Sequence, residues 1–232
     1  ATRNTLERLK DIRRDFKKIL HIGPRCADLY KTAYPALEIY TEGTLHDIGV
    51  LSLEPNTYDL ILSTLDMHTI NDLPGALSQL RASLKPDGLF LASLFGGETL
   101  FELRDSLAQA EIKTKNGISP RIFPFADKQQ MGGLLQRAGF ALPVVDSEIL
   151  TVTYPHIFKL MHELRGMGES NSIISRNKKN PGRALFFEAA QHYQNHHSDP
   201  DGRLRASFEI IFCLGWSPHA SQQQPLRPGS AK

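Results

Sequence analysis

The segment at 58–104 constrains the fold of this 232-residue chain more than any other. It begins with an apolar run at 60–62 that is typical of a buried strand. Leucine and alanine then recur at helical spacing over 73–84, and Lys85-Pro86-Asp87-Gly88 has the composition of a tight turn. A second apolar run follows at 89–92. Strand, helix, turn and strand in this order predict a right-handed βαβ unit of a parallel sheet.

The ends of these elements indicate where a ligand would bind. Asp72 suits the N-cap of the helix, and Pro74 falls in its first turn, where a missing N–H costs little. Ligands of parallel α/β sheets bind beyond the carboxyl ends of the strands. We therefore expect the residues at 63–68 and 95–98 to lie on the functional edge of the sheet.

Similar patterns organise the rest of the chain. They predict strands at 18–23, 37–40, 144–154 and 207–212, and helices at 26–33, 100–112, 126–138, 155–166 and 184–192. The roughly 50 residues between the last two strands exceed a hairpin loop and predict a helical insertion over the active edge. The last strand follows no simple crossover, so we expect it to run antiparallel. The expected parts are a basic N-terminal helix at 1–18, a core at 19–154, a helical lid at 155–205, a last core strand at 206–216 and a flexible tail at 217–232.

Composition narrows the class of protein. The net charge of +2 gives no general reason to expect nucleic-acid binding. No apolar run approaches the roughly 20 residues of a membrane span. Cys26 and Cys213 stand alone, which favours a reducing compartment, either the bacterial cytoplasm or a mitochondrial matrix. The first residues contain no signal-peptide core, although the chain lacks an initial Met and a targeting segment could precede it.

The N-terminal segment is strongly basic and allows two interpretations. Helical spacing predicts an amphipathic helix whose apolar side packs inward. That side consists of Leu6, Leu9, Ile12 and Phe16. The alternative is that the basic residues contact an acidic partner or carrier.

These motifs together resemble the class I S-adenosylmethionine (SAM) methyltransferase family. The YDLI strand, the NDLP helix start and the LKPDG turn carry the likeness. FGGETLFELR at 95–104, LRGMGESN at 164–171 and the GW…PGSA tail at 215–231 narrow it. They resemble the family of a mitochondrial complex I assembly factor and its bacterial relatives of the biotin-pathway methyltransferase type. The likeness covers roughly residues 15–231 and implies a Rossmann-like α/β fold with a seven-stranded, mostly parallel sheet and a helical insertion before the last strand.

The resemblance also implies SAM as cofactor, held by a D/E-x-G-x-G-x-G loop after the first strand. Only Gly23 matches this pattern here. His21 stands at the acidic position, Arg25 at the second glycine and Ala27 at the third. The arginine stands where the methionine part of SAM would pass, and the missing acid removes a partner for its amino group. We therefore expect SAM binding to be weak or lost.

Other residues fall at cofactor-binding positions of the family. Glu42 follows the second strand, where a carboxylate can accept bonds from both ribose hydroxyls. Asp47 lies where the family carries an acid near the adenine. Ser63 and Thr64 follow the strand at 58–62 and complete the expected set. Glu42 has an equally good alternative as a solvated loop acid.

Candidate substrate residues lie beyond the next strands. His68 is a candidate general base or orienting group, or else a polar loop residue. Gly96, Gly97 and Glu98 could let a substrate approach the backbone. Arg104 could hold a carboxylate or phosphate, or form a structural ion pair with Glu98 or Asp105.

The polar and flexible cluster at 166–171 gives the expected lid loop, which should face Gly96–Glu98, with a plain helix end as the alternative. The lid residues are Gly168, Glu169, Ser170 and Asn171. We expect no metal site, because His192 and His196 lack the glutamate of a zinc-protease motif and His196-His197 looks like a polar loop. Asp66 and His68 make only a weak fragment of an iron-binding facial triad.

Two functions remain open, because a fold does not establish a reaction. The first is SAM-dependent methyl transfer to a small-molecule, carrier-bound or protein acceptor. The alternative is an assembly or modification factor for a subunit of respiratory NADH dehydrogenase, acting as a hydroxylase or as a non-catalytic binding protein. The altered cofactor loop leaves open whether the chain is an enzyme.

Overall fold

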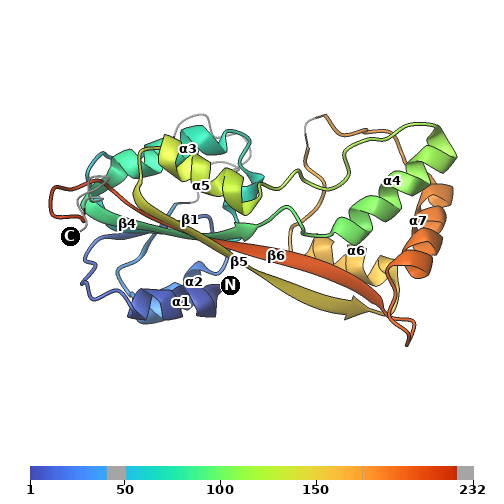
Figure 1. Cartoon of the computed structure of the whole chain (residues 1–232), viewed down its shortest axis with the longest axis horizontal. Coiled ribbons are helices and arrows are strands. Elements are labelled where there is room, and N and C mark those ends of the chain that lie inside the picture. The colour runs from blue at the N-terminus through green and yellow to red at the C-terminus, as the bar shows by residue number, and fades with distance from the viewer. Residues whose placement is uncertain (41–50, 174, 224–232) are drawn as a thin grey trace, which may run out of the picture. The chain divides into compact units, whose positions relative to one another are not determined.

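The structure is a computed structural model that describes residues 1–40, 51–173 and 175–223 (Figure 1). These residues form one sheet of six strands in the order β2-β1-β3-β4-β6-β5. The strands are β1 (Ile19–Ile22), β2 (Glu38–Tyr40), β3 (Tyr58–Thr64), β4 (Leu84–Phe95), β5 (Ala141–Tyr154) and β6 (Leu204–Trp216). The helices are α1 (Thr2–Lys10), α2 (Ala27–Ala33), α3 (Leu73–Ser83), α4 (Phe101–Lys115), α5 (Lys128–Arg137), α6 (Ile157–Gly166) and α7 (Arg183–His196). The expected count of seven strands is therefore six in the described part of the chain.

The described chain divides into two compact units. Unit 1 comprises Ala1–Leu94, Lys128–Asp146 and the chain from Phe212 onward. Unit 2 comprises Phe95–Asp127 and Ser147–Ile211. Strands β5 and β6 each contribute residues to both units, and helices α6 and α7 belong to unit 2.

Unit 1 contains the predicted βαβ unit. Strand β1 pairs in parallel with β2 and β3, and β3 pairs in parallel with β4. Figure 1 shows α1 and α2 on one face of these strands and α3 and α5 on the other. Both faces are therefore covered, which explains the continuous apolar runs that the sequence shows.

The last strand runs antiparallel, as expected. At one end, the Asp87 N–H donates to the carbonyl of Ser217 at 3.1 Å. At the other end, the Gly96 N–H donates to the carbonyl of Glu209 at 2.9 Å. Residue numbers fall along β6 as they rise along β4, which defines an antiparallel pair.

The turn predicted at 85–88 lies inside β4. Tyr58 pairs with Leu84 and Leu60 with Leu89, so extra residues of β4 bulge out between these pairs. Asp87 takes a φ of 61° in this bulge. Proline, aspartate and glycine therefore interrupt the pairing as the sequence indicates, but the strand has already begun before them.

The N-terminal helix is shorter than the expected 1–18. Helix α1 ends at Lys10, and the chain then turns so that Arg14 pairs with Asp87. The expected inward packing is nonetheless present. Leu9 is buried in the core of unit 1, and the three other predicted apolar residues pack against that core.

The helices predicted in the insertion are present as α6 and α7. That this insertion covers the cofactor edge, and the domain division drawn from the sequence, remain predictions. The start of the expected flexible tail makes defined contacts, because the Gln222 amide donates to Asp87 at 2.9 Å and to the carbonyl of Ser217 at 2.8 Å. Among the described helices, none combines the length and apolar character that crossing a bilayer requires.

Candidate functional site

The loop after β1 retains one glycine that the structure needs. Gly23 has a φ of 86°, a conformation that costs glycine little and other residues more. A Cβ at this position would overlap the carboxylate of Asp66. Cys26 also has a positive φ, of 61°, and α2 begins at the next residue. The backbone therefore turns sharply from β1 into a helix, as the family pattern implies.

Two charged side chains contact each other beside this loop. The Arg25 N–H donates to Asp66 Oδ2 at 3.2 Å, and Arg25 Nε lies 3.5 Å from Asp66 Oδ1. Arg25 Nη1 also donates to the carbonyl of Leu65 at 2.7 Å. The Asp66 side chain is only 8% exposed. Arg25 therefore brings a charged side chain, held against Asp66, into a loop where the family pattern has glycine.

His21 does not replace the acid of the family pattern. Its ring is fully buried, and Nδ1 lies 2.8 Å from the carbonyl of Gly23. Because a carbonyl only accepts, Nδ1 carries the proton. Burial lowers the pKa of His21, and the bond to Gly23 opposes that shift only in part. The residue is therefore a neutral donor that fixes the turn.

Of the four other expected cofactor residues, the structure describes two. Ser63 Oγ donates to the carbonyl of Ile22 at 3.2 Å, and Thr64 Oγ1 lies 2.8 Å from the hydroxyl of Tyr30. Both side chains are buried, so only the backbone of these two residues could contact a cofactor. That contact remains a prediction. Glu42 and Asp47 lie outside the described residues.

His68 keeps its place in the expected polar segment after β3. It lies in a short 3-10 helix, Met67–Thr69, and is partly exposed. Its role as a base or orienting group stays a prediction.

In unit 2, the loop after β4 is held by a buried carboxylate that sequence analysis did not identify. Glu209 is 5% exposed, and its Oε2 accepts from the Glu98 N–H at 3.0 Å. A Cβ on Gly96 would lie 2.5 Å from this same oxygen. Gly96 is therefore required for close approach to Glu209. The use of Gly96, Gly97 and Glu98 in substrate binding remains a prediction.

Arg104 braces that loop. Its Nη2 donates to the carbonyls of Gly97 at 3.1 Å and Thr99 at 3.0 Å. These carbonyls are contacts that neither of the two expected roles included. The guanidinium fixes the backbone between β4 and α4, and a role in holding an anionic substrate stays a prediction.

The expected lid residues begin with a helix end, which was the alternative interpretation. Gly168 has a φ of 81°, and its N–H bonds to the carbonyl of Arg165 at 3.1 Å. The Glu169 N–H bonds to the carbonyl of Leu164 at 2.9 Å, which completes a Schellman motif after α6. Ser170 follows this motif.

Two of the lid residues lie near the loop after β4. Glu169 and Asn171 line a cavity of about 30 Å³ together with Phe95 and Thr99, which flank Gly96–Glu98. The amide of Asn171 donates to the carbonyl of Pro120 at 3.0 Å. Two lid residues therefore share a cavity with the neighbours of Gly96–Glu98. That the lid faces Gly96–Glu98 and opens remains a prediction.

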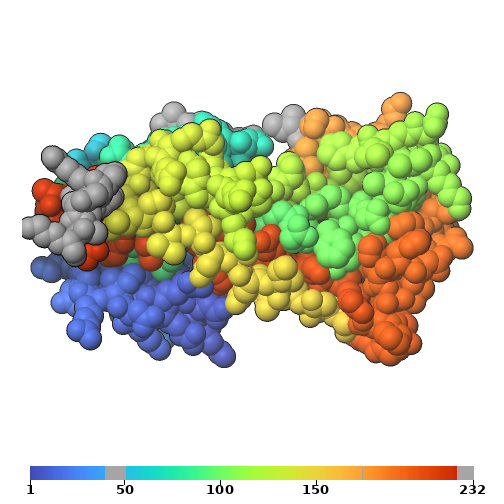
Figure 2. Space-filling view, in the orientation of Figure 1, coloured from blue at the N-terminus to red at the C-terminus, as the bar shows by residue number. Residues whose placement is uncertain are grey.

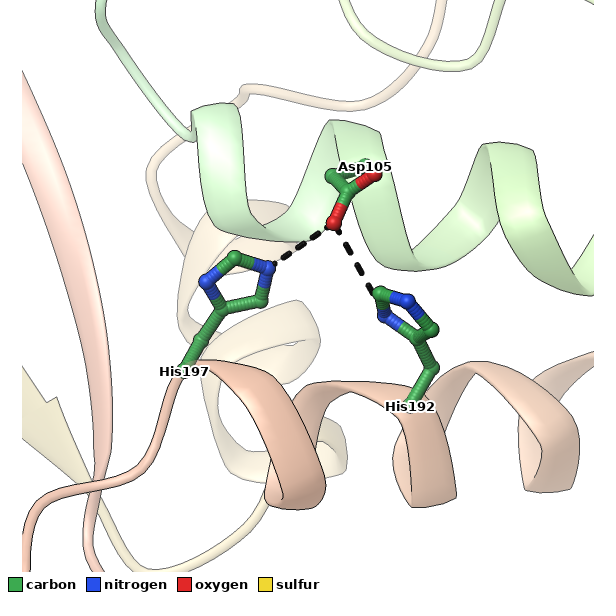
Figure 3. Close-up of side chains that lie close together, drawn as sticks. All are labelled: Asp105, His192 and His197. Atoms are coloured by element: carbon green, nitrogen blue, oxygen red, sulfur yellow. Dashed lines mark hydrogen bonds and ion pairs between the residues drawn. The ribbon is translucent and has the colours of Figure 1, made fainter.

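A cluster of metal-ligand residue types, which sequence analysis did not expect, lies between α4 and α7. Asp105 Oδ2 lies 3.0 Å from His197 Nε2 and 3.8 Å from His192 Nδ1 (Figure 3). One ligand atom from each residue lies within 4.8 Å of the others, and this is the cluster found in the described residues. The spacing of five residues between the histidines crosses a helix end, so no local pattern signals it.

The fold and the loops can now be compared with known proteins. A sequence model of the methyltransferase domain matches residues 4–143. The chain belongs to the methyltransferase domain family. The YcgJ protein of Bacillus subtilis has the same fold, with a TM-score of 0.58 at 12% identity over 95% of this chain and 100% of that one.

Similar curated proteins carry two different activities in their names. The chain is 43% identical over 84% of its length to "Arginine-hydroxylase NDUFAF5, mitochondrial" of Danio rerio, covering 60% of that protein. The Mus musculus protein of the same name is 40% identical over 97% of this chain and 71% of its own. A malonyl-[acyl-carrier protein] O-methyltransferase of Xylella fastidiosa is 36% identical over 74% of this chain and 56% of its own.

The chain spans only part of several relatives. It covers 41% of the Dictyostelium discoideum arginine hydroxylase and 56% of the human protein. A methyltransferase of this fold from Haemonchus contortus was solved with SAM, at a TM-score of 0.50 and 15% identity over 94% of this chain and 53% of that chain. That likeness concerns the fold alone.

Proposed function

We propose that this methyltransferase-family chain hydroxylates an arginine side chain of a protein subunit rather than transferring a methyl group from SAM. Molecular oxygen is the oxidant and a two-electron reductant is the co-substrate, so that one oxygen atom enters the arginine and the other leaves as water. The observation that supports the proposal is the contact between Arg25 and Asp66 beside Gly23, because it places a charged side chain where the family pattern has its second glycine. The choice of reaction rests on the relatives named arginine hydroxylase, which are 40–44% identical to this chain. The resemblance to the complex I assembly factor supplies the acceptor, a subunit of respiratory NADH dehydrogenase.

Methyl transfer to a carrier-bound carboxyl group is the second candidate. Gly23 keeps the left-handed turn that the family loop requires, and the O-methyltransferase relatives support this function. The two candidates differ in what the loop must bind. A SAM-dependent enzyme has to hold the cofactor in the unmodified loop, whereas the proposed hydroxylase does not.

Calorimetric titration with SAM and S-adenosylhomocysteine separates the two candidates. We expect little or no heat for the unmodified chain. A variant that combines His21→Asp, Arg25→Gly and Ala27→Gly should bind both ligands more tightly, because it restores the family pattern. Tight binding of SAM by the unmodified chain would contradict the proposal and favour methyl transfer.

The proposed reaction is tested separately by co-expression with the acceptor subunit. Peptide mass spectrometry should find one added oxygen atom on an arginine of the subunit, and none when this chain is omitted. An added methyl group in place of the oxygen would support the second candidate instead.

A further inference from the structure

Helices α4 and α7 form a polar seam within unit 2. Asp105, Gln109 and Lys113 recur at every fourth residue of α4, so they lie along one side of it. Lys113 Nζ pairs with Glu188 of α7 at 2.5 Å, and Asp105 meets the other end of α7. The helices are therefore antiparallel, and Figures 1 and 2 show the two segments side by side.

The Asp105 end of this seam has the spacing of a metal site. Adjacent ligands of an octahedral ion lie about 3.0 Å apart, and those of a tetrahedral ion about 3.4 Å apart, for bonds of about 2.1 Å. Asp105 Oδ2 lies 3.0 Å from His197 Nε2 and 3.8 Å from His192 Nδ1. Figure 3 shows the carboxylate pointing from α4 toward the two rings. Small side-chain rotations would bring all three atoms onto one ion.

The surrounding structure holds the histidines in place. The His197 N–H donates to the carbonyl of Tyr193 at 2.8 Å, and its own carbonyl accepts from the Arg205 N–H at 3.0 Å. The ring of Phe101 meets the His197 ring edge-on at 5.9 Å. His192 Nδ1 also lies 3.3 Å from the hydroxyl of Ser106, so this contact has to give way when Nδ1 binds an ion.

The cluster remains open to solvent. The side chains of His192 and His197 are 23% and 16% exposed, and that of Asp105 is 43% exposed. His192 also lines a surface groove of about 350 Å³ with Gln109, Gln191 and Asn195. A bound ion would therefore keep free coordination positions, unlike an ion in a closed structural site.

We infer that Asp105, His192 and His197 bind a divalent transition-metal ion such as Fe²⁺, Co²⁺ or Zn²⁺. Two imidazoles and one carboxylate suit ions of this borderline class, and the same set with open positions occurs in non-haem iron sites and in catalytic zinc sites. The inference goes beyond the proposed hydroxylation and is tested separately from it, because binding of the ion is measured on this chain alone, without an acceptor protein. The alternative is that hydrogen bonds between Asp105 and the histidines only tie the two helices together.

The test is calorimetric titration of the whole metal-free chain with Zn²⁺ and Co²⁺. We expect one metal site per chain. Asp105→Asn, His192→Ala and His197→Ala should each reduce the affinity for the ion by about 10-fold or more. His162→Ala is the matched control, since it removes an exposed histidine of α6 outside the cluster. Circular dichroism checks that each variant is folded, and Asp105→Asn preserves side-chain shape if an alanine variant fails to fold.

The absorption spectrum of the Co²⁺-loaded chain tests the open positions. Weak visible bands indicate five or six ligands and support the inference. Intense bands indicate four ligands, which are the three side chains and one solvent molecule, so one position is still open. Bands that do not shift when azide is added would overturn the part of the inference that concerns the groove. Equal affinity in the control and in all three cluster variants would overturn the site itself, as would the absence of binding by the unmodified chain.

Discussion

At the scale of single residues, the cofactor loop combines a retained feature with an altered one. Gly23 provides the backbone turn that a class I methyltransferase needs. Arg25, at a position where the family pattern has glycine, contacts Asp66 beside this turn. Sequence analysis identified Gly23 and Arg25 because they fall in a known pattern. It could not identify Asp66 as their partner, because that residue comes from the end of another strand.

Gly23→Ala tests how closely the loop packs on Asp66. We expect the free energy of unfolding to fall by about 1–3 kcal/mol more than for Gly139→Ala. Both glycines have a positive φ, 86° and 84°, so alanine is strained by the backbone conformation to a similar extent in both variants. Only at Gly23 would the new methyl group overlap a carboxylate, because the nearest atom to a Cβ at Gly139 lies 3.7 Å away. Equal losses in urea unfolding would contradict this account of the loop.

His21 predicts a dependence of stability on pH. Burial lowers the pKa of the folded ring below the ordinary 6.5, so the unfolded chain binds a proton more readily. This contribution to stability is complete above pH 6.5 and is lost as the pH falls toward the folded pKa, with a slope of up to about 1.4 kcal/mol per pH unit. His21 Nε2 has no hydrogen-bond partner among the described residues, so nothing there favours its protonation.

The measurement compares urea unfolding of the unmodified chain and His21→Gln between pH 7 and pH 5. The variant cannot titrate at this position, so its stability should fall less on acidification. Other histidines contribute equally to both proteins and cancel in the difference. Parallel pH profiles would show that His21 is protonated as easily in the folded chain as in the unfolded chain.

At the scale of elements, local patterns predicted most of what the structure contains. The βαβ unit follows from apolar spacing within one short segment, and β3, α3 and β4 confirm it. The errors arise where the partner is distant. The segment at 85–88 looks like a turn, yet β4 continues through it because Tyr58 pairs with Leu84. Ile12 and Phe16 pack as expected although α1 has already ended, because packing needs the apolar side chain and not the helix.

Asp72 caps the start of α3, and this cap contributes to the free energy of unfolding. The carboxylate of Asp72 accepts from the Gly75 N–H at 2.9 Å, which satisfies a backbone donor that the helix leaves free. Asp72→Ala should lower the free energy of unfolding by about 1 kcal/mol. Asp72→Asn should lose little, since asparagine caps helices about as well as aspartate. Urea unfolding of the three proteins checks the order, and equal losses in both variants would contradict the capping role.

At the scale of the whole molecule, the candidate sites lie in different units and respond to different ligands. The cofactor loop belongs to unit 1, and the Asp105 cluster belongs to unit 2. Sequence analysis reached the first through a motif but could not reach the second, because its three residues come together only when α4 packs on α7. Residues 41–50 lie outside the described part, so the expected roles of Glu42 and Asp47 remain predictions.

A metal ion bound at the cluster should stabilise the folded chain by mass action. At a free-ion concentration of 100 times Kd, the expected gain is about 2.7 kcal/mol, seen as a higher Tm. Hydrogen exchange should slow first in α4 and α7, with little change in α3 of unit 1. Asp105→Asn should show neither effect, and a Tm rise of equal size in that variant would mean that the ion binds elsewhere.

The division into units has a consequence for synthesis on the ribosome. The core of unit 1 is built on Ile19, Leu60 and Leu89, but Leu214 and Trp216 also pack against it. These last side chains emerge only after all of unit 2 has been translated. The nascent chain therefore carries an incomplete apolar core while the residues between Leu89 and Leu214 are synthesised. We expect chaperones that bind exposed apolar segments to associate with it until β6 has left the exit tunnel.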